Sequence, residues 1–255
     1  SNYIKKIGKI ADENDYRVFV VGGFVRDLIL GIEDKDIDIM VLGDGIKFAE
    51  LVAKESGTKL DAVYKNFETA LLKTADLKIE FASARKESYE RNSRKPKVET
   101  ATLEEDLSRR DFTINALALG LNKDNFGELT DSFNGYQDIE DKIIKTPLDP
   151  EKTFEDDPLR IMRAIRFASV LNFKIEEKTF QAIMKMNQRL KDEGVVSQER
   201  ITNEFLQILM SDKPSIGLDL LFKSGVMDII FPEISQLEGV DQRKDFHHKN
   251  VFYHT

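Results

Sequence analysis

The chain has no cysteine among its 255 residues. This absence excludes disulfides, zinc sites built on thiolates and a cysteine nucleophile, and it fits the reducing cytosol. No apolar run approaches the roughly 20 residues that a membrane-spanning helix needs. No signal peptide opens the chain at Ser1. We therefore expect a cytoplasmic protein that does not enter a membrane.

Basic residues are outnumbered by acidic ones, with 38 Lys and Arg against 46 Asp and Glu, so the formal net charge is −8. Proteins that bind nucleic acids are usually basic, so the total charge argues against RNA or DNA as a partner. One segment departs from this balance, since residues 85–97 contain six basic residues and two acidic ones. If the chain binds RNA, we expect contacts from this segment, which begins with Arg85 and Lys86.

The pattern of apolar and turn residues divides the chain into two halves. The predicted strands are 18–21, 36–41, 61–64, 69–72 and 77–81, and the predicted helices of the first half are 1–15, 24–30 and 45–56. Residues 86–106 lack periodicity and are densely charged, which predicts a mobile loop. From Pro158 onward the periods are helical, over 158–171, 176–190, 198–210 and 215–224. The fold class is therefore α+β, with an all-helical second half.

Two aspartates, Asp36 and Asp38, lie one residue apart in a predicted strand, so both carboxylates share one face. Paired carboxylates repel each other unless a cation lies between them, and their hard oxygens suit Mg²⁺. Just before them, Gly22 and Gly23 open a helix whose N-terminus can bind phosphate. This order predicts magnesium-dependent chemistry on a nucleoside triphosphate. Turn geometry for the glycines and surface charge for the aspartates remain simpler explanations.

Further polar residues can join this site. Glu80, in a later predicted strand, can extend the acid pair or remain an ordinary surface glutamate. Arg110 has a planar fork of donors that suits phosphate. Asn115, four residues after Asp111 on one predicted helix face, can contact a sugar. Residues 113–121 combine a predicted helical start with an apolar run. A simpler explanation without a ligand is that Asp111 caps this helical start and that the arginines beside it lie on the surface.

The helix predicted over 158–171 carries a basic stripe beside its apolar face. The stripe consists of Arg160, Arg163 and Arg166. Asp157 and Arg160, at i and i+3, can offer an acceptor and a fork of donors to the edge of a base. Asp157 is equally an ideal helix N-cap, which explains its position but not the stripe. Arg200 opens the next helix, where capping and a surface ion pair explain it almost as well.

The motifs of the chain, taken in order, closely resemble those of the bacterial tRNA nucleotidyltransferase/poly(A) polymerase family, class II of the DNA polymerase beta-like nucleotidyltransferases. The resemblance spans residues 16 to 255. The motifs are Gly22-Gly23-x-Val25-Arg26-Asp27, Asp36-x-Asp38, Arg109 to Asn115, Asp131-x-x-x-Gly135-x-x-Asp138, Asp157-Pro158-Leu159-Arg160 and Glu199-Arg200. Any one motif is a moderate signal, whereas the ordered set is very specific.

The resemblance implies an N-terminal nucleotidyltransferase head with a small mixed sheet (1–137), a helical neck for base recognition (138–195) and a helical body (196–255). It assigns Asp36 and Asp38 to two catalytic Mg²⁺ ions. The nucleotide-binding residues that it implies are Gly22, Gly23, Arg26, Arg110, Asp111, Asn115, Asp157, Arg160 and Arg163. Of these, Asp157 and Arg160 would pair with the Watson–Crick edge of the base, and Arg163 would stack on or support that pair. We add Glu80 as a possible metal ligand, and Arg85, Lys86, Arg166 and Arg200 as possible RNA contacts.

The implied reaction is template-independent addition of CCA to tRNA 3′ ends from CTP and ATP, with release of pyrophosphate by a two-metal mechanism and no role for DNA. Alternatives within the family are a poly(A) polymerase and an enzyme that adds only CC or only A. A Gly-Arg-Arg-Phe-like signature of bacterial poly(A) polymerases is replaced here by Tyr64-Lys65-Asn66-Phe67, which disfavours the first alternative. A non-catalytic RNA-binding protein, the alternative from another class, would not need two acids facing a phosphate chain.

The chain departs from the family pattern in two places. The usual Glu-Asp before the base-recognition helix is Asp156-Asp157 here, so we expect a supporting role at most for the first acid. Residues 248–255 resemble the opening of an HD-type metal domain, so we expect a fragment of a longer protein. The three histidines lie in the last nine residues, and the sequence does not decide whether His247, His248 and His254 bind a metal.

Overall fold

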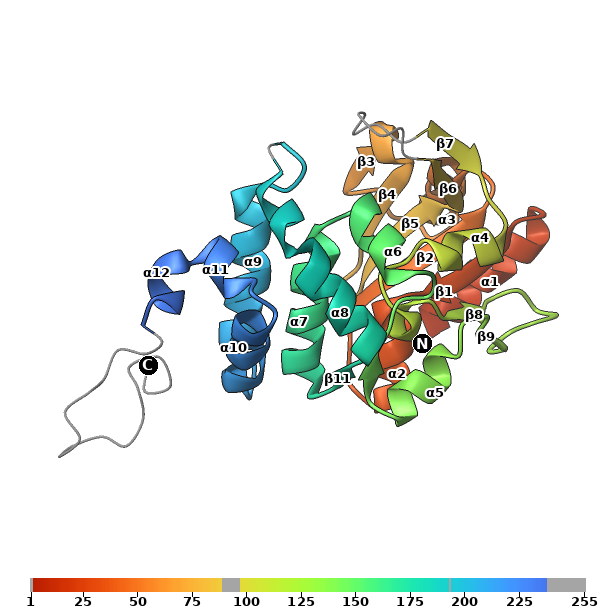
Figure 1. The fold of residues 1–255 in the computed structure, drawn as a ribbon. Coiled ribbons are helices and arrows are strands. Elements are labelled where there is room, and N and C mark those ends of the chain that lie inside the picture. The colour runs from red at the N-terminus through yellow and green to blue at the C-terminus, as the bar shows by residue number, and fades with distance from the viewer. Residues whose placement is uncertain (1, 89–96, 193, 238–255) are drawn as a thin grey trace. The chain divides into compact units, whose positions relative to one another are not determined.

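The computed structural model describes residues 2–88, 97–192 and 194–237. The chain forms two compact units, residues 1–141 and 142–255 (Figure 1). The predicted end of the head domain at residue 137 lies close to this boundary, and the further division at residue 195 stays a prediction. The histidines near the end of the chain fall outside the described residues.

The first unit is built on a seven-stranded mixed sheet with the order β3-β4-β5-β2-β1-β8-β9. Its strands are β1 (Arg17–Val21), β2 (Asp36–Leu42), β3 (Ala62–Tyr64), β4 (Thr69–Lys73), β5 (Lys78–Ser83), β8 (Ala118–Gly120) and β9 (Leu129–Thr130). A separate hairpin consists of β6 (Arg85–Ser88) and β7 (Lys97–Thr100). The helices are α1 (Asn2–Glu13), α2 (Gly23–Leu30), α3 (Gly45–Glu55), α4 (Leu103–Ser108) and α5 (Gly135–Glu140), with 3-10 turns η1 (Lys65–Phe67) and η2 (Thr113–Asn115).

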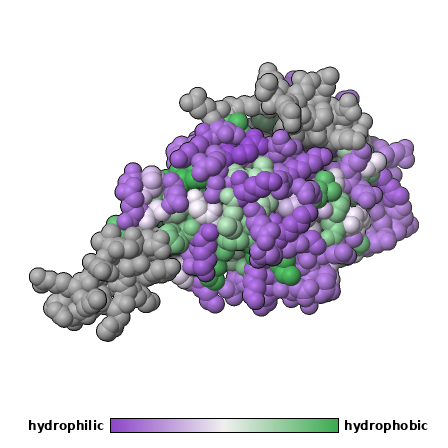
Figure 2. Space-filling view, viewed as in Figure 1, coloured by the Kyte–Doolittle hydropathy of each residue, from purple (hydrophilic) through white to green (hydrophobic). Residues whose placement is uncertain are grey.

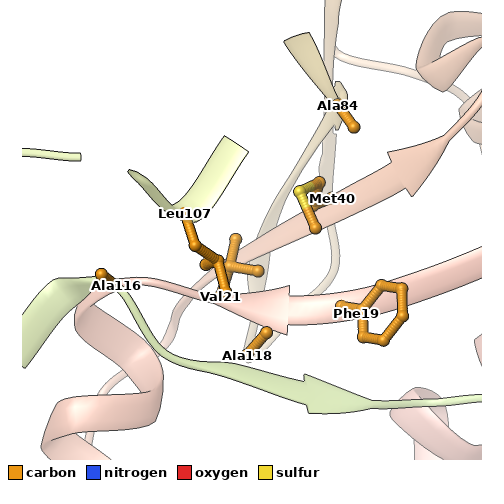
Figure 3. Packing of buried hydrophobic residues seen from close by; sticks show 7 residues of the cluster. All are labelled: Phe19, Val21, Met40, Ala84, Leu107, Ala116 and Ala118. Carbon is orange, nitrogen blue, oxygen red and sulfur yellow. The ribbon is translucent and has the colours of Figure 1, made fainter. Parts of the chain in front are cut away.

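The two faces of this sheet are filled in different ways. On one face, α3 packs against β2, β4 and β5, and the β2 residues that alternate with the aspartates are buried. On the other face, Asp36 and Asp38 are exposed, whereas Met40 further along the same strand is buried. Met40 belongs to an apolar cluster in which Leu107 of α4 reaches toward Val21 of β1 (Figure 3). A single strand therefore leads from a packed core to an open, acidic end.

The second unit is helical. Its helices are α6 (Pro150–Asp156), α7 (Leu159–Leu171), α8 (Glu177–Met186), α9 (Gln198–Leu209), α10 (Pro214–Lys223), α11 (Met227–Ile230) and α12 (Pro232–Ser235), with the 3-10 turn η3 (Asn187–Lys191). α7 packs against α9 and α10, and α6 packs against α8. The exception is the short parallel pair of β10 (Ile143–Ile144) and β11 (Lys174–Ile175). Apart from this pair, the predicted helical half is confirmed.

The prediction of a mobile loop over 86–106 is wrong for part of its length. Residues 97–100 form β7, and α4 begins after Thr102 with a capping box in which Thr102 and Glu105 exchange hydrogen bonds. The acids that argued for a loop occupy the first turn of this helix, where negative charge is favourable. Residues 89–96 lie outside the described residues.

The predicted helical start after Asp111 is limited to the single 3-10 turn η2, and no α-helix follows it. The apolar run that follows continues as β8, which pairs with β1. Pairing with β1 favours a strand over a helix in this apolar run, because it satisfies the backbone donors and acceptors of residues that are almost entirely buried.

The surface seen in Figure 2 is mostly hydrophilic, with hydrophobic residues scattered over it. No helix in the described parts of the chain is both long and apolar enough to span a membrane. In the first unit, Tyr64 and Phe67 are two large side chains that remain 51% and 62% exposed.

Candidate active site

The acid pair lies at the start of β2, with buried Ile37 between the two aspartates. β5 runs parallel beside β2 and places Glu80 opposite Asp38 and Lys78 opposite Asp36. Opposed residues of neighbouring strands point to the same side, so three carboxylates share this face. Among the described residues, however, no three His, Cys, Asp or Glu side chains gather closely enough to hold a metal ion. A ligand role for Glu80 therefore stays a prediction.

The Asp38 carboxylate has a raised pKa. Desolvation by the surrounding atoms is the largest cause, and together with repulsion from Glu80 and Asp36 it raises the pKa of Asp38 to about 6, against the opposing effects of Arg110 and Lys78. Asp38 is nevertheless exposed to solvent, so the raised pKa is attributed to the protein atoms and like charges around the carboxylate and not to exclusion of water. Hard oxygen donors under mutual repulsion fit a divalent cation such as Mg²⁺. Asp36 and Asp38 are the residues that would hold it.

Gly22 is the N-cap of α2 and lies close to the acid pair. Its φ of 76° lies in the left-handed region that favours glycine. A Cβ at this position would lie 2.9 Å from Arg110 Nη1 and 3.7 Å from Asp38 Oδ2. A side chain would therefore displace the arginine, and Gly22 is required by both turn geometry and close approach. Gly23 is the first residue of α2, and a Cβ added to it would lie 3.4 Å from Arg26 Nη2.

Asp106, a residue that the sequence reasoning missed, holds Arg110 in place. Its carboxylate is 1% exposed and lies 2.6 Å from Arg109 Nη2 and 3.1 Å from Arg110 Nη2. Burial alone would raise the pKa of Asp106, but attraction to Arg110 and Arg109 outweighs it and keeps that pKa below its usual value. The i, i+4 spacing of Asp106 and Arg110 is the signal that would have identified this pair.

The fixed arginine retains donors for a ligand. Arg110 Nε is buried and has no hydrogen-bond partner among the described residues, and Nη1 lies beside Gly22, 2.9 Å from where a Cβ on that residue would be. An unused donor next to the N-terminus of a helix can bind an anion such as phosphate, because both carry positive partial charge. This arrangement fits the predicted phosphate contact of Arg110.

Arg26 is buried in a polar network of the first unit. Its guanidinium donates to both Asp27 oxygens at 2.9 and 2.8 Å and to Asn115 Oδ1 at 2.6 Å. Asn115 Nδ2 in turn donates to Asp111 Oδ1 at 3.0 Å. The predicted pairing of Asp111 with Asn115 thus exists without the predicted helix. These bonds give Arg26 a positioning role, and its contact with a triphosphate stays a prediction.

In the second unit, Asp157 makes two contacts. Its Oδ1 accepts a hydrogen bond from the Leu159 backbone N–H at 3.1 Å, at the start of α7, and its Oδ2 lies 3.1 Å from Arg200 Nη2. Arg160 follows one turn later, and both Asp157 and Arg160 are half-buried. Arg200, predicted as an RNA contact, is therefore held against Asp157. The N-cap of α7 is Pro158, one residue after the predicted cap, and Asp157 bonds the first N–H group of the helix from the residue before it. This bond does not exclude a second role for Asp157.

The basic stripe predicted on α7 is partly covered by α9, and the RNA contact of Arg166 stays a prediction. The Arg166 side chain is only 11% exposed, and its Nε donates to Glu204 Oε2 of α9 at 2.5 Å. The Arg163 Nη1 atom lies 3.8 Å from the other oxygen of Glu204. Arg166 therefore forms a largely buried contact between α7 and α9. The sequence of α7 alone could not predict this contact, because it does not reveal which side of the helix α9 covers.

Of the first two residues of the basic segment, the Arg85 side chain is described and that of Lys86 is not. Arg85 Nη1 donates to the Phe67 backbone oxygen at 3.2 Å. The basic segment therefore starts against η1, at the β3 edge of the sheet.

Comparison with known proteins identifies the family. The family model described as the poly(A) polymerase head domain matches residues 18–145. A second one, described as the probable RNA and SrmB-binding site of polymerase A, matches residues 172–237. The chain belongs to the class II tRNA nucleotidyltransferase/poly(A) polymerase family. This confirms the resemblance drawn from the ordered motifs.

Relatives in this family act on tRNA. The chain is 40% identical over 239 residues to the A-adding tRNA nucleotidyltransferase of Aquifex aeolicus (strain VF5), covering 94% of this chain and 28% of that protein. Among solved structures, the apo form II of a CCA-adding enzyme aligns with a TM-score of 0.81 at 38% identity, covering 91% of this chain and 54% of that one. A tRNA nucleotidyltransferase complexed with a primer tRNA and an incoming ATP analog aligns with a TM-score of 0.76 at 36% identity, covering 94% and 64%. The chain thus spans less than two thirds of these relatives.

Proposed function

We propose that this chain is the catalytic part of an enzyme that adds nucleotides to tRNA 3′ ends from CTP and ATP and releases pyrophosphate. The observation that carries the proposal is the meeting of Asp38 and Arg110 at Gly22. An acid pair that suits a metal and an arginine that suits phosphate flank one backbone position. The relatives that bind tRNA and nucleotides support the same reaction.

Each part of the first unit has a task in this reaction. Arg110 and the N-terminus of α2 bind the triphosphate, and Asp106 keeps Arg110 oriented before the substrate arrives. Mg²⁺ held by Asp36 and Asp38 would stabilise the charge that develops on the phosphate under attack. Asp111 and Asn115 form a fixed polar surface for the sugar. Positioning and electrostatic stabilisation carry most of the catalysis in phosphoryl transfer, so a prearranged network is well suited to it.

Base choice belongs to α7 in this proposal. Asp157 offers acceptors and Arg160 offers a fork of donors, which complement the amino group and ring nitrogen shared by cytosine and adenine. Uracil and guanine present a carbonyl where the amino group should be. That carbonyl would face the Asp157 carboxylate and leave a group unpaired, at a cost of about 1–3 kcal/mol.

A second candidate is an enzyme that adds only the terminal A, because the Aquifex aeolicus relative carries that name. The products distinguish the two. End-labelled tRNA that stops at the discriminator base, and tRNA that stops after CC, are each incubated with this chain, Mg²⁺ and CTP, ATP or both. Full addition to the shorter tRNA with both nucleotides supports CCA synthesis. Addition of A to the CC-ending tRNA alone supports the second candidate, and no addition to either contradicts both.

A further inference from the structure

We propose that Tyr64, Lys65 and Phe67, at the β3 edge of the sheet, form a stacking surface for the unpaired 3′ end of the RNA that accepts the nucleotide. This inference rests on the proposed function. It adds a direction of approach and a binding surface for the RNA, which the acid pair and the arginine do not provide.

The direction follows from where the triphosphate site lies within the first unit. Gly22 and Arg110 lie on the β1 side of β2, where Val21 pairs with Asp38. In phosphoryl transfer the attacking and leaving oxygens lie roughly in line on opposite sides of the phosphorus. If the leaving pyrophosphate lies toward β1, the attacking hydroxyl approaches from the other side of β2. On that side lie β5, β4 and β3, in this order.

The register of these strands carries the acid-bearing face to the edge of the sheet. Met40 of β2 is opposite Ala82 of β5, which is opposite Thr69 of β4, which is opposite Tyr64 of β3. Opposed residues share a face, so Tyr64 projects on the same side as Asp36 and Asp38. Three strand spacings, about 14 Å, separate β2 from β3 across the sheet, and Tyr64 lies two residues, about 7 Å, further along the strands than Asp38. A short single-stranded RNA end spans such a distance.

Two lysines lie on the same face of the sheet, level with Asp36. Lys73 of β4 is directly opposite Lys78 of β5, and both are exposed. Like charges opposed across strands destabilise a sheet, and a polyanion that lies over them offsets the repulsion. Lys78 also reaches the acid pair through its contact with Asp36. Positive charge therefore lies next to the acid pair on the β5 and β4 side of β2, beside the carboxylate of Glu80.

The edge itself has the chemistry that binds unpaired bases. All five residues 63–67 are exposed, and two of them are aromatic side chains that flank a lysine and an asparagine. Single exposed apolar residues are normal on a protein surface. Aromatic rings next to positive charge, by contrast, are the means by which proteins bind single-stranded RNA, since bases stack on the rings and phosphates contact the cations. Arg85, bonded to the Phe67 oxygen, places the start of the basic segment at the same edge.

The test compares two exposed sites of the first unit. The double variant Tyr64→Ala/Phe67→Ala removes the proposed surface, and Phe126→Ala removes an aromatic side chain that is 48% exposed near the opposite edge of the sheet, between β8 and β9. Fluorescence anisotropy measures binding of two labelled tRNAs without added Mg²⁺. One keeps unpaired nucleotides at its 3′ end, and the other is trimmed to a fully paired acceptor stem.

We expect the double variant to bind the tRNA with the unpaired end about tenfold more weakly, the equivalent of one lost stacked base. Its affinity for the trimmed tRNA and the affinities of Phe126→Ala should match those of the unaltered chain. The conservative variant Tyr64→Phe/Phe67→Tyr keeps both rings and should bind normally. Unchanged affinity in the double variant, an equal loss for the trimmed tRNA, or an equal loss in the conservative variant would overturn the proposal. Failure of the unaltered chain to extend tRNA would contradict the proposed function and leave this binding result standing.

Discussion

Charged residues are held in contrasting ways in the two units. In the first unit, Asp106 and Arg26 are almost completely buried, and each contacts at least two polar partners. In the second, Asp157 and Arg160 are half-buried at the start of one helix, and the Asp157 carboxylate is held by a single backbone N–H and by Arg200. The first arrangement fixes charge before a substrate binds. In the proposed function, the second would allow the small rotation that accepting both cytosine and adenine requires.

Asp38→Asn tests the fixed side most severely. The amide keeps the shape but loses the charge that would hold Mg²⁺, so several kcal/mol of transition-state stabilisation should disappear. This corresponds to a loss of turnover of about a thousandfold, measured as the rate of nucleotide addition at saturating CTP. Glu50→Gln, an exposed change on α3, is the control. Turnover near the normal rate in Asp38→Asn would mean that the acid pair is not the metal site.

Asp106→Asn should give the largest change in stability. It leaves Arg109 and Arg110 without a counter-charge in a buried place, at a cost of about 3 kcal/mol. The lowered pKa of Asp106 means that its contribution is complete above the ordinary aspartate value of about 4 and is lost as the pH falls through the folded-state value. Urea unfolding should show the full difference from the unaltered chain at neutral pH and a smaller one near pH 3. Glu104→Gln, an exposed change on the same helix, should show neither.

The raised pKa of Asp38 predicts the opposite pH dependence. Its folded-state pKa of about 6 lies above the unfolded value of about 4, so the folded protein holds this proton more tightly. Ionisation of Asp38 therefore begins to destabilise the fold above about pH 4, and the effect is complete above about pH 6. In the presence of EDTA, Asp38→Asn should melt at a higher temperature than the unaltered chain at pH 8 and at the same temperature near pH 4. A lower melting temperature at pH 8 would contradict the crowding of this carboxylate.

Arg200→Met should produce the smallest effect, and it sharpens the description of the second unit. The ion pair with Asp157 is partly exposed, so its loss should cost at most about 1 kcal/mol of stability. Discrimination against UTP should fall by a few fold, because the Asp157 carboxylate loses one of its two contacts. Arg166→Met breaks the buried contact with Glu204 and should lower stability by more, with selectivity unchanged. If Arg166→Met lowered discrimination against UTP and Arg200→Met left it unchanged, Arg200 would not position Asp157.

Local patterns in the sequence predicted much of this molecule. The shared face of Asp36 and Asp38 follows from strand alternation alone, and the helix predicted over 24–30 is α2, which Gly31 ends in the left-handed conformation. The errors occur where a distant partner decides. β8 forms because it pairs with β1, and Arg166 is buried because α9 packs over it. Asp106 is a different case, because its partners Arg109 and Arg110 follow α4 directly and their spacing was a local signal.

The division of tasks between the two units is tested most directly by Asp157→Ser. Serine keeps the helix cap, so the melting temperature should stay close to that of the unaltered chain. The measurement is kcat/KM for CTP, ATP and UTP on tRNA that stops at the discriminator base or after CC. The account predicts that the preference for CTP and ATP over UTP falls by about tenfold or more, because the carboxylate that opposes a carbonyl is gone. Full retention of that preference, with normal stability, would show that Asp157 is only a cap and that base choice lies elsewhere.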